Sequence, residues 1–187
     1  MSPELVITTG ITVSLAFFGY IITYVNNLRL SQRSERLERV NRQLSSLYGP
    51  LFAMAHASQM AWDAFRKKYR PNHILYFDAS EPITEDDLKA WRLWMETVFM
   101  PNNLQMYELI TSKADLLIES EMPSCLLEFC AHVTAYKAVI KKWSQNDFTE
   151  HLSYVSYPGP ALLVYTKESF QRLKAEQTRL MGKQKNR

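Results

Sequence analysis

A stretch near the N-terminus, Leu5–Leu51 (LVITTGITVSLAFFGYIITYVNNLRLSQRSERLERVNRQLSSLYGPL), decides how this chain is organised. In its apolar first half, small residues recur at alternating steps of three and four: Thr9, Thr12, Ala16, Gly19 and Thr23. The same steps continue beyond it and pick out Asn26, Leu30, Arg33, Leu37, Val40, Leu44, Leu47 and Leu51. In an α-helix, such positions lie along one stripe. The pattern predicts one helix whose stripe is small at first and leucine-rich afterwards.

The apolar run Leu5–Val25 predicts a membrane span. It contains no charged residue and, at about 1.5 Å per helical residue, is roughly 31 Å long, the thickness of a hydrocarbon core. A cleavable signal peptide is the alternative, but it needs positive charge before the run and a small-residue cleavage site after it. Met1–Glu4 and Asn26–Arg29 supply neither feature. We therefore expect residues 1–25 to be an uncleaved transmembrane anchor.

Basic residues lie on one side of this run. No Lys or Arg precedes Leu5, whereas five arginines follow the run: Arg29, Arg33, Arg36, Arg39 and Arg42. The positive-inside rule places the flank richer in Lys and Arg in the cytoplasm. We therefore expect a single-pass protein with a cytoplasmic C-terminal body, whose first arginines lie near the lipid headgroups.

Residues 26–48 predict an amphipathic stalk helix, and two interpretations of its stripe compete. In the first, Leu30, Leu37 and Leu44 pair with another copy as a short coiled coil, with Asn26 setting the register. In the second, the stalk folds back and its leucines join the core of the soluble domain. About three heptads are available, which is short for a coiled coil. We favour self-association slightly.

The remaining chain predicts an all-α fold, an antiparallel bundle of about four or five helices over residues 49–182, followed by a basic tail at 183–187. Apolar residues recur at helical spacing in each predicted segment. Gly49-Pro50 is expected to interrupt or kink the first of these helices, and Met100-Pro101 is expected to end another. Thr84, followed by three acidic residues, predicts a helix start.

Composition excludes several classes of function. The net charge of +3 is small for a dedicated nucleic-acid binder. The few glycines, five in the chain, are scattered singly, so no phosphate-binding loop is present. Cys125 and Cys130 are five residues apart and would point to different faces of a helix. We expect no nucleic-acid partner and reduced thiols in a cytosolic domain.

No catalytic signature is present, and we expect no enzyme activity, no metal and no cofactor. Glu128 and His132 share a helical face, but a bundle metal centre needs the closer Glu-x-x-His spacing on two helices. His151 lies beyond that helix in a polar-aromatic segment, Phe148–Leu152, which we interpret mainly as a packed connection. No Gly-x-Ser-x-Gly motif occurs, and no histidine is spaced to activate a cysteine.

The sequence therefore predicts a membrane-anchored interaction or scaffold module, paired with its own copies or with other membrane subunits. Close helix approach in lipid would use the membrane association face: Thr12, Ala16, Gly19 and Thr23. The alternative is a membrane-anchored sensor or effector that binds an anionic small ligand or lipid headgroup. Its ligand would lie on a basic patch at the end of a predicted helix: Arg66, Lys67, Lys68 and Arg70.

Overall fold

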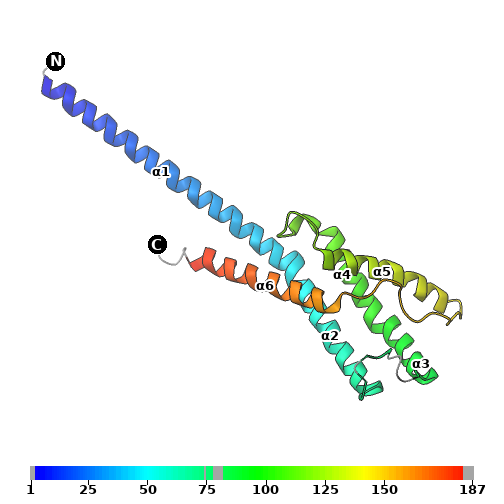
Figure 1. The fold of residues 1–187 in the computed structure, drawn as a ribbon. Coiled ribbons are helices and arrows are strands. Elements are labelled where there is room, and N and C mark those ends of the chain that lie inside the picture. The colour runs from blue at the N-terminus through cyan, green and yellow to red at the C-terminus, as the bar shows by residue number, and fades with distance from the viewer. Residues whose placement is uncertain (1–2, 74, 78–81, 183–187) are drawn as a thin grey trace. The chain divides into compact units, whose positions relative to one another are not determined.

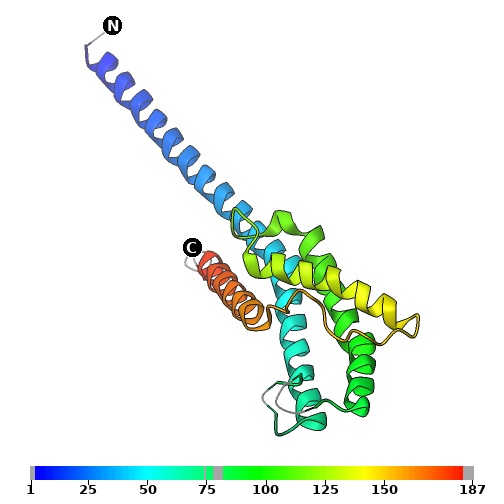
Figure 2. The same cartoon turned by 45° about the vertical axis from the view of Figure 1, so that its right-hand side comes forward.

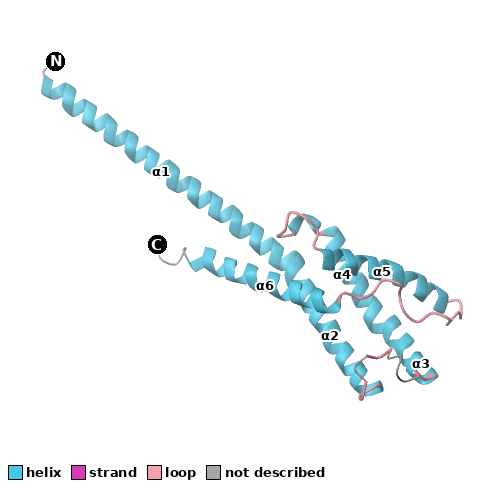
Figure 3. Ribbon diagram, in the orientation of Figure 1, coloured by secondary structure: helices cyan, strands magenta, loops and turns pink. Residues whose placement is uncertain are grey.

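A computed structural model describes the backbone of residues 3–73, 75–77 and 82–182, and the side chains of this part except at residues 3–6, 8, 9 and 11. Throughout this part the regular structure is helical and no strand occurs (Figure 3). The predicted all-α fold is therefore confirmed. The predicted basic tail, 183–187, lies outside the described residues.

The chain divides into two compact units. One unit contains residues 1–41 and 176–187, and the other contains residues 42–175. The long helix α1 (Pro3–Gln43) supplies most of the first unit (Figure 1). The predicted boundaries between anchor, stalk, bundle and tail, at residues 25, 48 and 182, remain predictions.

Within the part of the chain that the structure describes, no helix is long and apolar enough to cross a membrane. The predicted span, Leu5–Val25, includes residues 5, 6, 8, 9 and 11, whose side chains lie outside the described residues.

The second unit is a helical bundle, as the sequence predicts. Its elements in chain order are η1 (Leu44–Tyr48), α2 (Gly49–Tyr69), α3 (Glu85–Trp94), η2 (Met95–Phe99), α4 (Met100–Ser112), η3 (Ala114–Leu116), α5 (Ser124–Trp143) and the first part of α6 (Gly159–Gly182). Helix α4 packs against both α2 and α5 (Figure 2). The side-chain amide of Asn102 on α4 donates a 3.2 Å hydrogen bond to the backbone carbonyl of Met54 on α2.

Helix α3 begins where the sequence predicts. The Thr84 hydroxyl accepts a 3.1 Å hydrogen bond from the Asp87 amide, and the Asp87 carboxylate accepts one from the Thr84 amide. This capping box satisfies two amide groups that the first helical turn would otherwise leave unpaired.

A π-helical turn interrupts the α-helix before Gly49-Pro50, whereas the predicted end at Met100-Pro101 is wrong, because the helix continues through it. A π-helical turn precedes each proline: η1 comes before Gly49-Pro50, and η2 comes before Met100-Pro101. In these turns the Gly49 amide donates to the Leu44 carbonyl and the Met100 amide donates to the Met95 carbonyl, each five residues back. The wider turn relieves the contact between a proline ring and the preceding turn, which otherwise breaks an α-helix.

The turn at η1 requires a glycine at its end. A Cβ atom placed on Gly49 would lie 2.5 Å from the Leu44 carbonyl oxygen, a backbone atom that cannot swing away. Alanine is more favourable than glycine inside a helix by about 1 kcal/mol, but forced overpacking typically costs about 1–3 kcal/mol. We expect Gly49→Ala to destabilise the bundle by on the order of 1–2 kcal/mol in a denaturant titration. Gly182→Ala, with open space around the new Cβ, is the control, and equal effects would contradict the prediction.

An aromatic cluster fills one end of the bundle core. Phe65 on α2 is fully buried at its centre, with the Tyr76 and Tyr69 rings 4.7 and 5.0 Å away and the Trp94 ring 5.3 Å away. Further rings lie about 6 Å from Phe65, from α2, α3 and η2: Trp62, Trp91 and Phe99. These tryptophans are therefore packing residues, as their helical spacing predicts.

Candidate functional site

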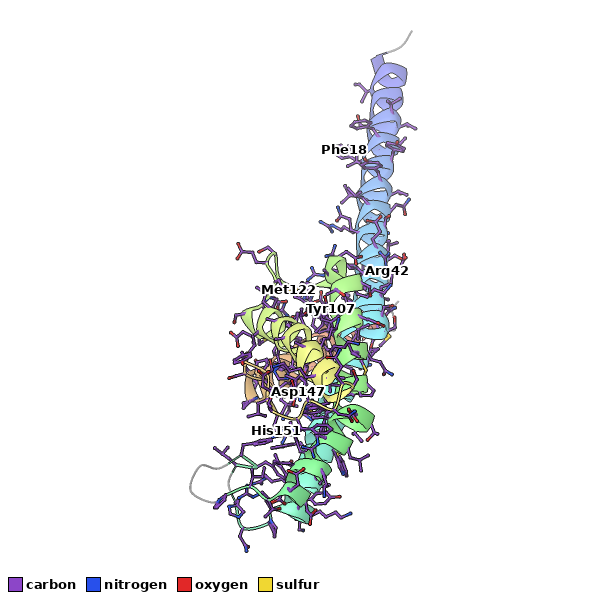
Figure 4. The ribbon with its side chains drawn as sticks, turned by 90° about the vertical axis from the view of Figure 1, so that its right-hand side faces the viewer. Phe18, Arg42, Tyr107, Met122, Asp147 and His151 are labelled. Atoms are coloured by element: carbon purple, nitrogen blue, oxygen red, sulfur yellow. The ribbon has the colours of Figure 1, made fainter. Side chains whose placement is uncertain are left out.

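The predicted membrane association face lies on an exposed part of α1. All side chains from Thr12 to Tyr24 are exposed, and they project around the helix near Phe18 (Figure 4). A Cβ atom on Gly19 would meet nothing within 4 Å, so this side of the helix is open. The Thr23 hydroxyl donates a 2.9 Å hydrogen bond to the Gly19 carbonyl, which lets a polar side chain remain on an apolar helix. The four predicted residues thus share an accessible stripe.

The predicted stalk residues differ in exposure. Leu30 is 41% exposed, Leu37 is half-buried and Leu44 is buried. Val40 and Leu47 are buried as well. The end of the stripe is therefore buried, while Leu30 keeps an accessible surface.

The predicted basic patch does not form one surface. The Arg66 guanidinium donates a 2.9 Å hydrogen bond to the His73 carbonyl, and the buried Arg70 guanidinium donates one of 2.7 Å to the Tyr76 carbonyl. These two arginines hold the connection that follows α2. Lys67 and Lys68 are exposed on the helix surface. The structure thus separates the four residues into an anchoring pair and an exposed pair.

The connection between α5 and α6, residues 144–158, is here called the strap, and buried side chains hold its backbone. The indole of Trp143 donates a 2.7 Å hydrogen bond to the Glu150 carbonyl. The Tyr136 hydroxyl and the Trp91 indole both donate to the His151 carbonyl, at 2.6 and 2.8 Å. Asp147 and His151 mark the strap in Figure 4. These hydrogen bonds join the strap to α3 and α5, so it is a packed connection, as predicted.

A backbone hydrogen bond holds the His132 ring in place. His132 is buried, and its Nδ1 lies 2.6 Å from the Val155 carbonyl oxygen, so Nδ1 carries the proton and donates. Glu128, its predicted neighbour, is exposed. No group of three or more His, Cys, Asp or Glu residues gathers to hold a metal among the residues described.

Burial lowers the pKa of His132, although the hydrogen bond to Val155 opposes this, and burial followed by the positive charge of Arg92 lowers the pKa of His151. The folded state thus holds both side chains neutral, while the unfolded chain takes up protons near the ordinary value of about 6.5. Stability is therefore expected to fall as pH decreases below about 6.5. A series of thermal melts between neutral pH and about pH 5 measures this, and His132→Gln should flatten the slope. An unchanged slope in that variant would contradict the assignment.

A hollow of about 460 Å³ lies where the strap meets α3 and η2. Its walls are three charged and three apolar side chains: Lys89, Arg92, Leu93, Glu96, Trp143 and Phe148. Arg92 is 9% exposed; its Nη2 donates a 2.7 Å hydrogen bond to Glu85, and its guanidinium carbon lies 4.4 Å from the centre of the Phe148 ring. Arg92 Nη1 and His151 Nδ1 are buried, and neither has a hydrogen-bond partner within the described part of the chain.

An unpaired buried N–H group costs about 1–3 kcal/mol, so an acceptor that reached Arg92 would recover that free energy. Phe148 covers the guanidinium but is 43% exposed, which leaves room for its ring to swing outward. The hollow is thus bounded by two aromatic side chains, two basic side chains and the Glu96 carboxylate. The sequence did not single out Arg92, because its environment depends on the path of the strap.

Two tyrosine hydroxyls and a carboxylate form a further cluster that the sequence did not predict. Tyr48 and Tyr165 share a 2.9 Å hydrogen bond, and the Tyr165 hydroxyl donates one of the same length to the Glu119 carboxylate. The Ile118 amide donates to the Tyr48 hydroxyl at 3.1 Å. Burial raises the pKa of both tyrosines, so the hydroxyls stay protonated. The cluster ties η1 and α6 to the segment after η3, and nothing in the spacing of these residues predicts it.

Comparisons with known proteins found no match: no family model, curated protein or solved structure is significantly similar to this chain.

Proposed function

We propose that this protein is a single-pass, membrane-anchored interaction module with a cytoplasmic helical bundle. The observation that carries the proposal is the exposure of large apolar side chains along α1: Val13, Leu15, Phe17, Phe18, Ile21 and Ile22. A helix that is apolar on all sides needs to be buried in a protein or in lipid. In the described structure no other part of the chain covers these side chains. Their exposure therefore favours burial against lipid or another protein.

The sequence supports the same proposal. The run Leu5–Val25 has no charge, and five arginines follow it between residues 29 and 42. This basic flank favours a cytoplasmic bundle under the positive-inside rule. Tyr20 and Tyr24 lie near the end of the run, where aromatic side chains favour the membrane interface.

Membrane fractionation of the full-length chain tests the anchor. After an alkaline carbonate wash, an integral protein is expected to stay in the membrane pellet, because the wash removes peripherally bound proteins. A protease added outside sealed inside-out vesicles should then digest the bundle, and added outside right-side-out vesicles it should not. Recovery of the chain in the carbonate supernatant would refute the proposal.

Self-association through the face containing Thr12, Ala16, Gly19 and Thr23 is the second part of the proposal. Small residues let two helix backbones approach closely in lipid, and a leucine at the centre of the contact would hold them apart. We expect Gly19→Leu to reduce association several-fold in a membrane two-hybrid reporter. Gly10→Leu is a matched control, since Gly10 is equally open but lies off this stripe. Equal signals from the two variants would show that this face does not pair.

A second candidate function is binding of a small anionic ligand, and the unpaired Arg92 Nη1 favours it. The proposed ligand would then bind at the hollow beside the strap instead of at the basic patch around Lys67. Thermal melts of the full chain with added inorganic phosphate distinguish the two places. A salt-sensitive increase in Tm that is lost in Arg92→Gln and kept in Lys67→Gln/Lys68→Gln would support the hollow. The opposite pattern would support the basic patch, and no increase would reject both.

A further inference from the structure

The hollow beside the strap combines one buried donor with exposed apolar walls. Arg92 lines the hollow, and its Nη1 has no hydrogen-bond partner among the described residues. Leu93 and Phe148 also line it, although these large apolar side chains are 57% and 43% exposed. Exposed apolar side chains at a concave site favour an apolar guest, and an unpaired N–H group favours an acceptor on that guest.

Arg92 keeps donor capacity beyond its ion pair. A guanidinium has five N–H groups, and the Glu85 carboxylate accepts from Nη2 at 2.7 Å. The Phe148 ring covers the guanidinium at 4.4 Å, measured from the guanidinium carbon to the ring centre, but it supplies no oxygen or nitrogen acceptor. The pair with Glu85 therefore does not satisfy Nη1.

The charges of the wall suit a guest with a single negative charge. Lys89, Arg92 and Glu96 line the hollow, so two positive charges accompany one negative charge. Glu85 and Asp86 pair with Arg92 and Lys89, but both of these carboxylates are exposed, and water and salt weaken exposed pairs. A carboxylate brings one negative charge and two acceptor oxygens in the plane that a guanidinium recognises.

We propose that the ligand of this hollow is an aromatic carboxylate. Its ring packs against Leu93, Phe148 and Trp143, and its carboxylate accepts a hydrogen bond from Nη1 of the arginine beside them. Phe148 is exposed enough for its ring to swing outward, which gives the carboxylate access to the buried Nη1. The hollow of about 460 Å³ lies within the usual range for small-molecule sites, about 300–1,000 Å³. This inference rests on the second candidate function, binding of a small anion, and names the class of anion.

The test titrates (4-fluorophenyl)acetate into the purified full chain and follows the fluorine NMR signal of the probe. Fluoroacetate lacks the ring, and 2-(4-fluorophenyl)ethanol lacks the charge. Burying a CH₂-sized group contributes roughly fourfold in binding, and a hydrogen bond to a charged group contributes about tenfold or more. We expect the aromatic carboxylate to bind about tenfold or more tightly than either of the other probes.

Two pairs of variants locate the site. Arg92→Gln should weaken binding of the aromatic carboxylate by about tenfold or more, whereas Lys67→Gln, at an exposed basic position of α2, should not. Because Arg92→Gln also breaks the pair with Glu85, the second pair uses exposed leucines. Leu93→Glu removes an apolar wall and adds a negative charge, so it should abolish binding.

Leu127→Glu is the matched control for Leu93→Glu and should leave binding unchanged. Leu127 is 56% exposed on α5 and lies roughly 24 Å along that helix from Trp143 in the wall of the hollow. Nonspecific partition of the probe into lipid or detergent would be the same in all variants.

The outcomes separate this inference from the function on which it rests. Equal affinities for fluoroacetate and the aromatic carboxylate, both lost in Arg92→Gln, would overturn the inference and leave small-anion binding at the hollow intact. Equal affinities for the aromatic carboxylate and the alcohol, or equal weakening by Leu93→Glu and Leu127→Glu, would also overturn the inference. Binding of neither anion would overturn both.

Discussion

Phe65→Ala is expected to lower the free energy of unfolding of the bundle by about 3–5 kcal/mol, the usual range for truncating a fully buried phenylalanine. The Phe65 side chain is 0% exposed, and six aromatic rings from α2, α3, η2 and the connection after α2 surround it. The surrounding rings belong to separate helices and cannot all move inward. Most of the cavity that Phe65→Ala leaves should therefore remain. Edge-to-face and tilted ring contacts would be lost in addition to the buried area.

Tryptophan emission during urea unfolding measures this loss, because Trp62, Trp91 and Trp94 lie beside Phe65. Met60→Ala is the matched control on the same helix, since Met60 is 73% exposed and surface substitutions usually change stability by less than about 0.5 kcal/mol. If the two variants unfolded at the same urea concentration, the aromatic cluster would not be the centre of the core.

The sequence predicted the helices well because their signals are local. Alternating three-and-four spacing indicates an apolar face, and the Thr84–Asp87 capping box marks a helix start within four residues. The predicted helix end at Met100-Pro101 is wrong for a related reason. Pro50 and Pro101 carry a strong helix-breaking signal, but whether a chain breaks or widens by one π-turn depends on packing around the turn.

The candidate sites were less predictable, because they depend on where connections run in space. Arg66 and Arg70 look like surface charge in the sequence, yet the connection that follows α2 passes beside them and offers carbonyl acceptors. Arg92 looks like one charge among several on an amphipathic helix, and the strap brings Phe148 over its guanidinium. Contacts of this kind join residues up to 56 positions apart, so no spacing rule could have found them.

A double substitution in the apolar half of α1, Leu15→Lys/Phe18→Lys, is expected to remove the protein from the carbonate-washed membrane pellet. Leu15 and Phe18 are near the middle of the uncharged run, and both side chains are more than 60% exposed on the helix. A lysine at the centre of a membrane helix costs about 2.5–3.5 kcal/mol, and the lost apolar residue adds about 0.5 kcal/mol. Two such changes are therefore expected to cost roughly 6–8 kcal/mol, enough to prevent insertion of a run already diluted by Thr, Ser and Gly.

Leu28→Lys/Leu30→Lys is the matched control, because it adds the same charge to the same helix just beyond the run. Leu28 and Leu30 are 46% and 41% exposed, and lysines there would add to the basic flank. This variant should stay in the pellet. Loss of both variants would indicate that charge anywhere on α1 disrupts an attachment to another protein. Retention of both would place the attachment outside α1, and retention of the control alone would mean that lipid covers the exposed apolar side chains of this helix.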